Sequence, residues 1–126
     1  MRTRIGSGSP YEPRYGFSRA IRIGQRVLVA GTAPIPPPGR PLPDDAYGQT
    51  HLCLEIALAA LSELGASVGD VVRTRMYLVD GSDADEVGRA HGEVFGSVRP
   101  VATMVVVKEL LDPAWRVEVE IEAEIH

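Results

Sequence analysis

The sequence predicts a single-domain α+β protein with a mostly antiparallel sheet that carries two helices on one face. The chain has 126 residues, which suits one domain. Segments with a two-residue apolar period are interrupted by two segments with helical spacing, in the order β-β-α-β-α-β-β. Because each helix follows strand material, we expect both helices to pack on the same side of one sheet.

Composition and charge argue against several classes of protein. The net charge is −4, and the 13 Lys and Arg residues are scattered, so nucleic acid is not expected as a partner. The single cysteine, Cys53, excludes an intramolecular disulfide. No apolar run reaches membrane length, and the N-terminus lacks the apolar core of a signal peptide. We therefore expect a cytoplasmic protein without a membrane partner.

The first strands form a predicted hairpin. Residues 1–15 are polar and lack a period, so we expect a loose N-terminal segment before a domain that spans 16–126. Alternating side chains over 17–23 and a second apolar run over 26–30 indicate two strands. Gly24 stands first in the two-residue connection, which is typical of a type II′ turn.

A proline-rich segment separates this hairpin from the first helix. Residues 33–43 contain six prolines and predict a semi-extended loop. Asp44 or Asp45 can cap a helix that runs to Leu64, where Gly65 ends it. The apolar face of this helix is broad, which favours packing against a sheet.

The second half of the chain predicts a strand, a helix and two further strands. The strand spans 71–79, and Ser82 or Asp83 can cap a helix over 82–95. The segment 101–108 is apolar on both faces, which is typical of a central strand.

The last strand, 117–125, suggests self-association. Apolar residues alternate there with four glutamates, so one face is apolar and the other is acidic. If the helices cover the apolar face, the glutamates and one face of 101–108 remain bare, unless another copy of the chain covers them. Arg73 and Arg75 are candidate partners for the glutamates, which otherwise form a solvated or intersubunit polar face.

Several short segments that fall on these predicted elements occur in the same order in a known protein family. They are Val29–Thr32, Gln49–Thr50, Leu64–Ala66, Val71–Tyr77, Arg99–Met104 and Val117–Glu120. In this order the chain resembles the reactive-intermediate deaminase (Rid, or YjgF-like) family. The resemblance implies a chorismate-mutase-like fold, a homotrimer with a small-molecule cleft at each subunit boundary, and no metal or organic cofactor. Family members hydrolyse reactive enamines and imines to keto acids and ammonia.

The resemblance also implies a missing anchor. In the deaminases, the motif Pro-x-Arg-Ser/Thr supplies an arginine that holds the substrate carboxylate. Here the motif reads Pro100-Val101-Ala102-Thr103, so alanine stands in the arginine position. We therefore do not expect standard activity on 2-imino acids. Arg19, Arg99 or Arg116 could supply a substitute charge, or each could be a surface arginine.

Glu118 aligns with the family's water-positioning glutamate and is the candidate catalytic residue. The alternative, a residue of the polar face, stays open. The candidate ligand-binding residues are Phe17, Ser18, Arg19, Gly31, Thr32, Ala102, Thr103 and Trp115. Phe17 stands where relatives have tyrosine, and Trp115 could be a lid or a packing residue. The three histidines show no metal-ligand spacing, so no metal site is expected.

Three functions are compatible with these residues. The first is hydrolysis of an imine or enamine that lacks a carboxylate, with Glu118 directing water. The second is binding of a metabolite in the clefts without turnover. The third is the endoribonuclease or translation-inhibitor activity for which some relatives are labelled, and the acidic balance makes it the least favoured.

Overall fold

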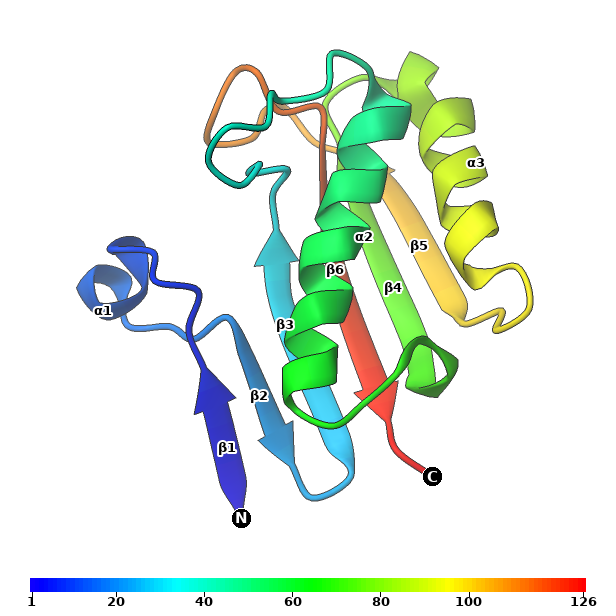
Figure 1. Cartoon of the computed structure of the whole chain (residues 1–126). Coiled ribbons are helices and arrows are strands. Elements are labelled where there is room, and N and C mark those ends of the chain that lie inside the picture. Colours follow the sequence, from blue (N-terminus) through cyan, green and yellow to red (C-terminus); the bar gives the residue numbers. More distant parts are fainter.

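The computed structural model describes all 126 residues and confirms the α+β class (Figure 1). It also contains short 3₁₀ turns before β4 and before α3. The strands and helices are β1 (Arg2–Ile5), α1 (Tyr11–Tyr15), β2 (Ala20–Ile23), β3 (Arg26–Thr32), α2 (Ala46–Glu63), β4 (Val71–Leu78), α3 (Ala84–Phe95), β5 (Val101–Val106) and β6 (Val117–Glu124). None of the helices combines the length and the apolar character that a membrane span requires.

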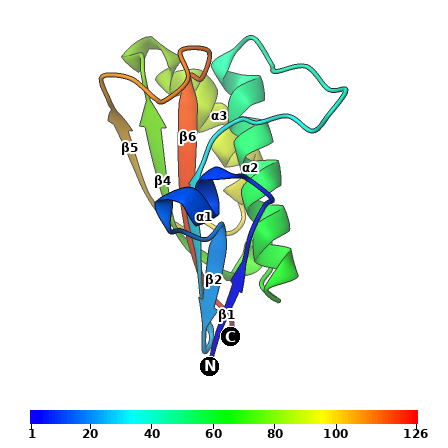
Figure 2. The same cartoon turned by 90° about the vertical axis from the view of Figure 1, so that its left-hand side faces the viewer.

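The six strands form one sheet in the order β1-β2-β3-β6-β4-β5. All neighbours are antiparallel except β4 and β5, which run parallel because α3 connects them. Both long helices lie on the same face of this sheet, as the edge-on view in Figure 2 shows. The predicted mostly antiparallel sheet with two helices on one face is therefore confirmed.

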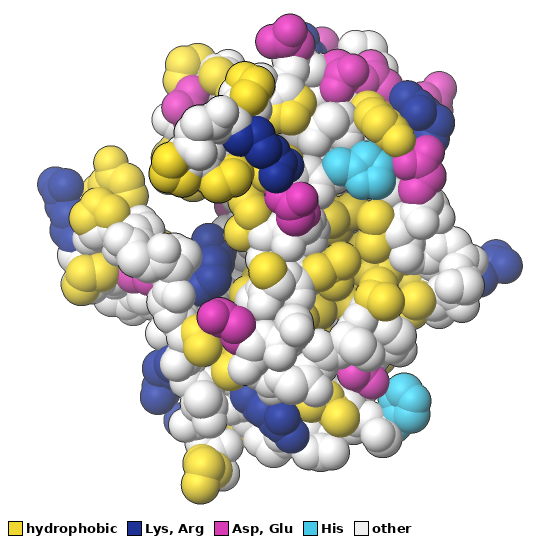
Figure 3. Space-filling view, in the orientation of Figure 1, with side chains coloured by type: hydrophobic (Ala, Val, Ile, Leu, Met, Phe, Trp, Pro, Cys, Tyr) yellow, Lys and Arg dark blue, Asp and Glu magenta, His cyan; other side chains and the backbone are white.

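The core lies between this face and the helices. In β6, Val117, Val119 and Ile121 are at most 1% exposed, whereas the alternating glutamates point to the uncovered face. Burying an aliphatic side chain of this size contributes roughly 1.5–3 kcal/mol. Hydrophobic side chains also fill the seam between α2 and α3 (Figure 3). The two-residue period of β6 thus fixes which face of the sheet stays open.

The helix ends are confirmed for α2 and corrected for α3. The Asp45 carboxylate accepts a hydrogen bond from the Gly48 backbone N–H at 2.7 Å, and α2 ends before Gly65, whose φ is +88°. At α3, Asp83 occupies the N-cap position, but its side chain makes no cap hydrogen bond and instead pairs with Arg116 at 3.1 Å. An ion pair between the buried Asp83 carboxylate and the partly exposed Arg116 has replaced the predicted cap.

The N-terminal segment holds two elements that the sequence pattern did not reveal. Strand β1 pairs with β2 along its whole length, and α1 follows it. A four-residue edge strand with two exposed arginines carries no readable apolar period, which explains the omission. The predicted hairpin between β2 and β3 is present, with φ of +61° at Gly24 as the turn requires.

Strand β5 lies at the edge of the sheet, so its prediction as a central strand was wrong. It pairs only with β4, and Val101, Val105 and Val106 are 61%, 42% and 59% exposed. An exposed apolar edge strand is a template for association with another chain. Burial within one chain therefore does not explain why β5 is apolar on both faces, whereas contact with another chain would.

Candidate functional site

The site is built around a close approach between β3 and β6. The pairing of these strands shifts register between Val29 and Thr32, so the backbone bulges at Gly31. There the Glu118 carboxylate packs against the Gly31 Cα, and a Cβ atom at this position would collide with the Glu118 Oε2 atom. Glycine is required here because the carboxylate occupies the space of a side chain.

Arg19 joins this contact from the loop before β2. Its NH2 group donates a hydrogen bond to the Gly31 carbonyl oxygen. Burial lowers the pKa of the Arg19 guanidinium from its usual range, while the charges of Glu12 and Glu118 act in the opposite direction. The Arg19 Nε–H is buried without a hydrogen-bond partner in the chain. One N–H group of Arg19 therefore binds the protein's own backbone.

Glu118 is a half-buried carboxylate to which no group of the chain donates a hydrogen bond. Desolvation raises the pKa of Glu118 above its usual range, the charge of Arg19 opposes that rise, and the charge of Glu120 adds to it. A carboxyl group with a raised pKa can take up and release a proton closer to neutral pH than an ordinary glutamate. Its lone pairs remain available to a water molecule or a ligand.

Two cavities meet at Glu118. The smaller, of about 340 Å³, is lined by Gly31, Tyr77, Val107, Glu109, Leu110, Glu118 and Glu120. The larger, of about 700 Å³, is lined by Val79, Lys108, Glu109, Leu110, Leu111, Asp112, Pro113, Trp115 and Glu118. We call the two together the Glu118 cleft. The structure thus brings three of the candidate residues, Glu118, Gly31 and Trp115, to one place.

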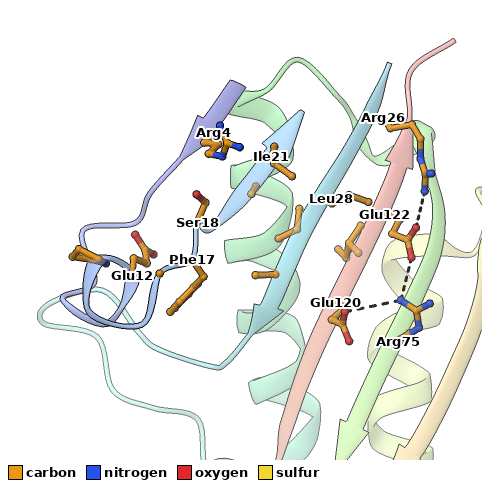
Figure 4. A pocket seen from close by; sticks show the side chains of 16 residues that line it. Arg4, Glu12, Phe17, Ser18, Ile21, Arg26, Leu28, Arg75, Glu120 and Glu122 are labelled. Carbon is orange, nitrogen blue, oxygen red and sulfur yellow. Dashed lines mark hydrogen bonds and ion pairs between the residues drawn. The ribbon is translucent and has the colours of Figure 1, made fainter. Parts of the chain in front are cut away.

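Phe17 and Ser18 line a different cavity, of about 800 Å³, on the uncovered face of the sheet (Figure 4). Its floor carries ion pairs between strands: Glu122 contacts Arg26 at 2.9 Å and Arg75 at 3.0 Å. Arg73 also reaches Glu122, at 3.5 Å, so the predicted pairing of Arg73 and Arg75 with the glutamates is confirmed.

The remaining predicted residues do not reach the Glu118 cleft within one chain. Thr32 is 1% exposed, and its hydroxyl donates to the Ala30 carbonyl oxygen at 2.8 Å. Ala102 and Thr103 lie on β5, which β4 separates from β6. Ala102 is paired with Thr74, whose side chain contacts α3, so Ala102 lies toward the helix side of the sheet. Glu118 lies on the opposite side.

Sequence reasoning missed the wall of the cleft and the clamp behind it. Glu109 and Leu110 follow β5 in a segment without periodicity, and only their place after a strand end could have suggested a role. The buried Gln49 donates to the Pro43 and Ala114 carbonyl oxygens at 3.0 and 3.1 Å, and it accepts from the Arg116 N–H at 2.7 Å. This amide fixes the loop that carries Trp115.

The cysteine and two of the histidines lie in surroundings that give them a structural role. Burial raises the pKa of the Cys53 thiol well above its usual range, which leaves it unreactive. His51 contacts Glu93 at 2.8 Å and His91 contacts Thr74 at 2.8 Å. No group of three His, Cys, Asp or Glu side chains is placed to hold a metal ion.

Gly31→Ala should disrupt the contact on which the site depends. The added methyl group meets the Glu118 carboxylate, so we expect a loss of roughly 1–3 kcal/mol in the free energy of unfolding. Gly88→Ala in α3 is the control, because its Cβ would meet no atom within 4 Å, and it should stabilise by about 0.5–1 kcal/mol. Urea unfolding measures both, and equal effects at the two glycines would contradict the close approach.

Glu118→Gln should stabilise the fold at neutral pH. The raised pKa means that the folded state favours the protonated carboxyl, so stability from this group is lost as pH rises through the folded-state pKa. Glutamine removes that penalty at pH 7, and its advantage should vanish at about pH 4, where the wild-type carboxyl is protonated too. Thermal unfolding at both pH values measures this. A variant less stable at pH 7 than the wild type would refute desolvation as the cause.

Comparison with known proteins places the chain in a family. The pattern of the family described as "Endoribonuclease L-PSP" matches residues 8–125. An uncharacterised Streptomyces coelicolor protein is 44% identical over 120 residues, covering 95% of this chain and 90% of the relative. A RutC family protein of Pyrococcus abyssi is 37% identical over 95 residues, covering 75% of each chain.

The fold agrees with this placement. The crystal structure of Rv2704 from Mycobacterium tuberculosis, described as a member of the YjgF/YER057c/UK114 family, superposes with a TM-score of 0.91 at 43% identity. The match covers 99% of this chain and 100% of that one. Sequence pattern, relatives and structure agree: the chain belongs to the endoribonuclease L-PSP family, also known as the YjgF or reactive-intermediate deaminase family.

Proposed function

We propose that the protein is a homotrimer that binds a small imine or enamine in the Glu118 cleft and hydrolyses it. The observation that carries this proposal is the Glu118 carboxylate itself. It is half-buried, has a raised pKa, receives no hydrogen bond from the chain and lies against the Gly31 backbone in a cavity. A carboxylate whose burial destabilises the fold, and whose lone pairs are free, is typical of a functional site.

The chemistry needs only a positioned water and a proton carrier. In the proposed reaction, Glu118 accepts a proton from water while the water oxygen attacks the C=N carbon. The proton then passes to nitrogen, the C–N bond breaks, and the products are a carbonyl compound and ammonia or an amine. The Gly31 backbone lies against the Glu118 carboxylate, and Arg19 fixes that backbone through its hydrogen bond to the Gly31 carbonyl oxygen, which limits the motion of the side chain.

Self-association is supported by the bare parts of the sheet. The exposed valines of β5 form an apolar edge that another copy of the chain would cover. Ala102 and Thr103 lie apart from Glu118 in one chain, so a cleft that combines them requires a second copy. The family's trimeric assembly would provide that copy.

A binding protein without turnover is the second candidate, and Ala102 favours it. Alanine cannot hold a carboxylate, and Arg19 lines neither cavity of the Glu118 cleft, so neither residue anchors a 2-imino acid there. RNA remains the least favoured ligand, because the lining of the smaller cavity includes three glutamates and no cationic side chain.

The assembly can be tested on β5. The wild-type protein should have the mass of a trimer in solution at micromolar concentration, measured by light scattering after gel filtration. Val105→Glu places a charge on the exposed strand and should yield monomers. Val68→Glu, at another exposed valine in the turn before β4, should remain trimeric. A monomeric wild-type protein would contradict the proposal.

Activity can be tested with freshly generated 2-aminoacrylate. We expect turnover close to the uncatalysed rate, because the anchor position is Ala102. Ala102→Arg should raise turnover at least about tenfold if the anchor alone is missing, since a charge-assisted pair contributes about 1.5–3 kcal/mol. Adding Glu118→Gln to that variant should abolish the gain. Rapid wild-type turnover that survives Glu118→Gln would rule out Glu118 as the proton carrier.

A further inference from the structure

The charge of the Glu118 cleft indicates the class of ligand that it accepts. This step rests on the proposed function, since it takes the cleft as the binding site and asks only which charge the ligand carries. Within one protomer, the smaller cavity is lined by three carboxylates, those of Glu109, Glu118 and Glu120, and by no cationic side chain. The larger cavity adds Asp112 and a single cation, Lys108.

The carboxylates differ in how far the chain neutralises them. Glu120 accepts a hydrogen bond from the Tyr77 hydroxyl and lies 4.0 Å from Arg75. Glu118 and Glu109 take part in no ion pair or side-chain hydrogen bond of the chain. The Arg19 charge acts on Glu118 only from behind Gly31, because Arg19 lines neither cavity. Two negative groups therefore face the same space without a partner.

The rest of the cleft wall is apolar. Val79, Leu110 and Leu111 line the larger cavity together with Trp115, the only tryptophan of the chain. An indole face attracts a cation as well as apolar groups. A site in which unpaired carboxylates share a cavity with an aromatic and aliphatic wall is complementary to an amphipathic cation.

We propose that the ligand of the Glu118 cleft is a cation: an amine, or an iminium ion with an apolar body and no carboxylate. Its nitrogen lies between Glu118 and Glu109, and its apolar part lies against Trp115 and Leu110. For an iminium ion, water adds to the C=N⁺ carbon, and the C–N bond then breaks to give a neutral carbonyl compound and a protonated amine. Atoms and charge balance without an oxidant or a cofactor.

Three probes of one shape test the charge preference. Cyclohexylmethylamine is protonated at neutral pH, cyclohexanecarboxylate is anionic and cyclohexylmethanol is neutral. None of them absorbs where tryptophan does, so the fluorescence of Trp115 in the intact oligomer reports binding, and calorimetry confirms the affinity. We expect the amine to bind at least about tenfold more tightly than the carboxylate, a ratio that corresponds to one charge-assisted contact.

Two variants locate the effect. Glu118→Gln should weaken binding of the amine about tenfold and leave the affinity for the alcohol unchanged. Glu124→Gln is the matched control, because it removes a carboxylate from the same strand and lines neither cavity. It should change neither affinity.

The outcomes separate the two proposals. Binding of the alcohol with no preference for the amine, or with a preference for the carboxylate, would overturn the cationic ligand and leave the cleft as a binding site. An amine preference that survives Glu118→Gln would overturn the assignment to Glu118. If none of the three probes binds to the folded oligomer at millimolar concentration, both the ligand class and the cleft itself are wrong.

Discussion

The structure depends on the strict alternation of β6. Its valines and Ile121 complete the core beneath α2, and the same two-residue period sends every glutamate to the uncovered face. A shift by one residue would bury four carboxylates, so the register of this central strand is strongly specified. Fold and site are thus set by one pattern, because the strand that closes the core also delivers Glu118.

Along that acidic face, the surroundings of the glutamates differ. Glu122 lies among three arginines and belongs to an ion-pair network that links β3, β6 and β4. Glu118 lies at the other end, where the bulge of β3 brings backbone rather than a cation to the carboxylate. Four similar residues in the sequence therefore have different chemistry, and position along the strand decides which of them is available to a ligand.

Much of the fold was predictable, since α2, β4 and β6 have strong periods and clear end signals. The edge elements were harder: β1 is too short to show a period, and β5 is apolar without being buried in the chain. Within the site, Glu118, Gly31 and Trp115 converge as expected, whereas Thr32 binds its own backbone. The clamp at Gln49 depends on hydrogen bonds to Ala114 and Arg116, which lie 65 and 67 residues further along the chain, and no local pattern encodes such contacts.

The central claim is that Glu118 is a desolvated carboxylate that the chain leaves without a hydrogen-bond donor. The most direct test is to follow the side-chain carboxyl carbons of the isotopically labelled protein by NMR as a function of pH, with Glu118→Gln used to assign the resonance. We expect the pKa of Glu118 to lie above the usual range of glutamate, because burial disfavours the charged form. A pKa of Glu118 within or below that usual range would contradict the desolvation of this carboxylate.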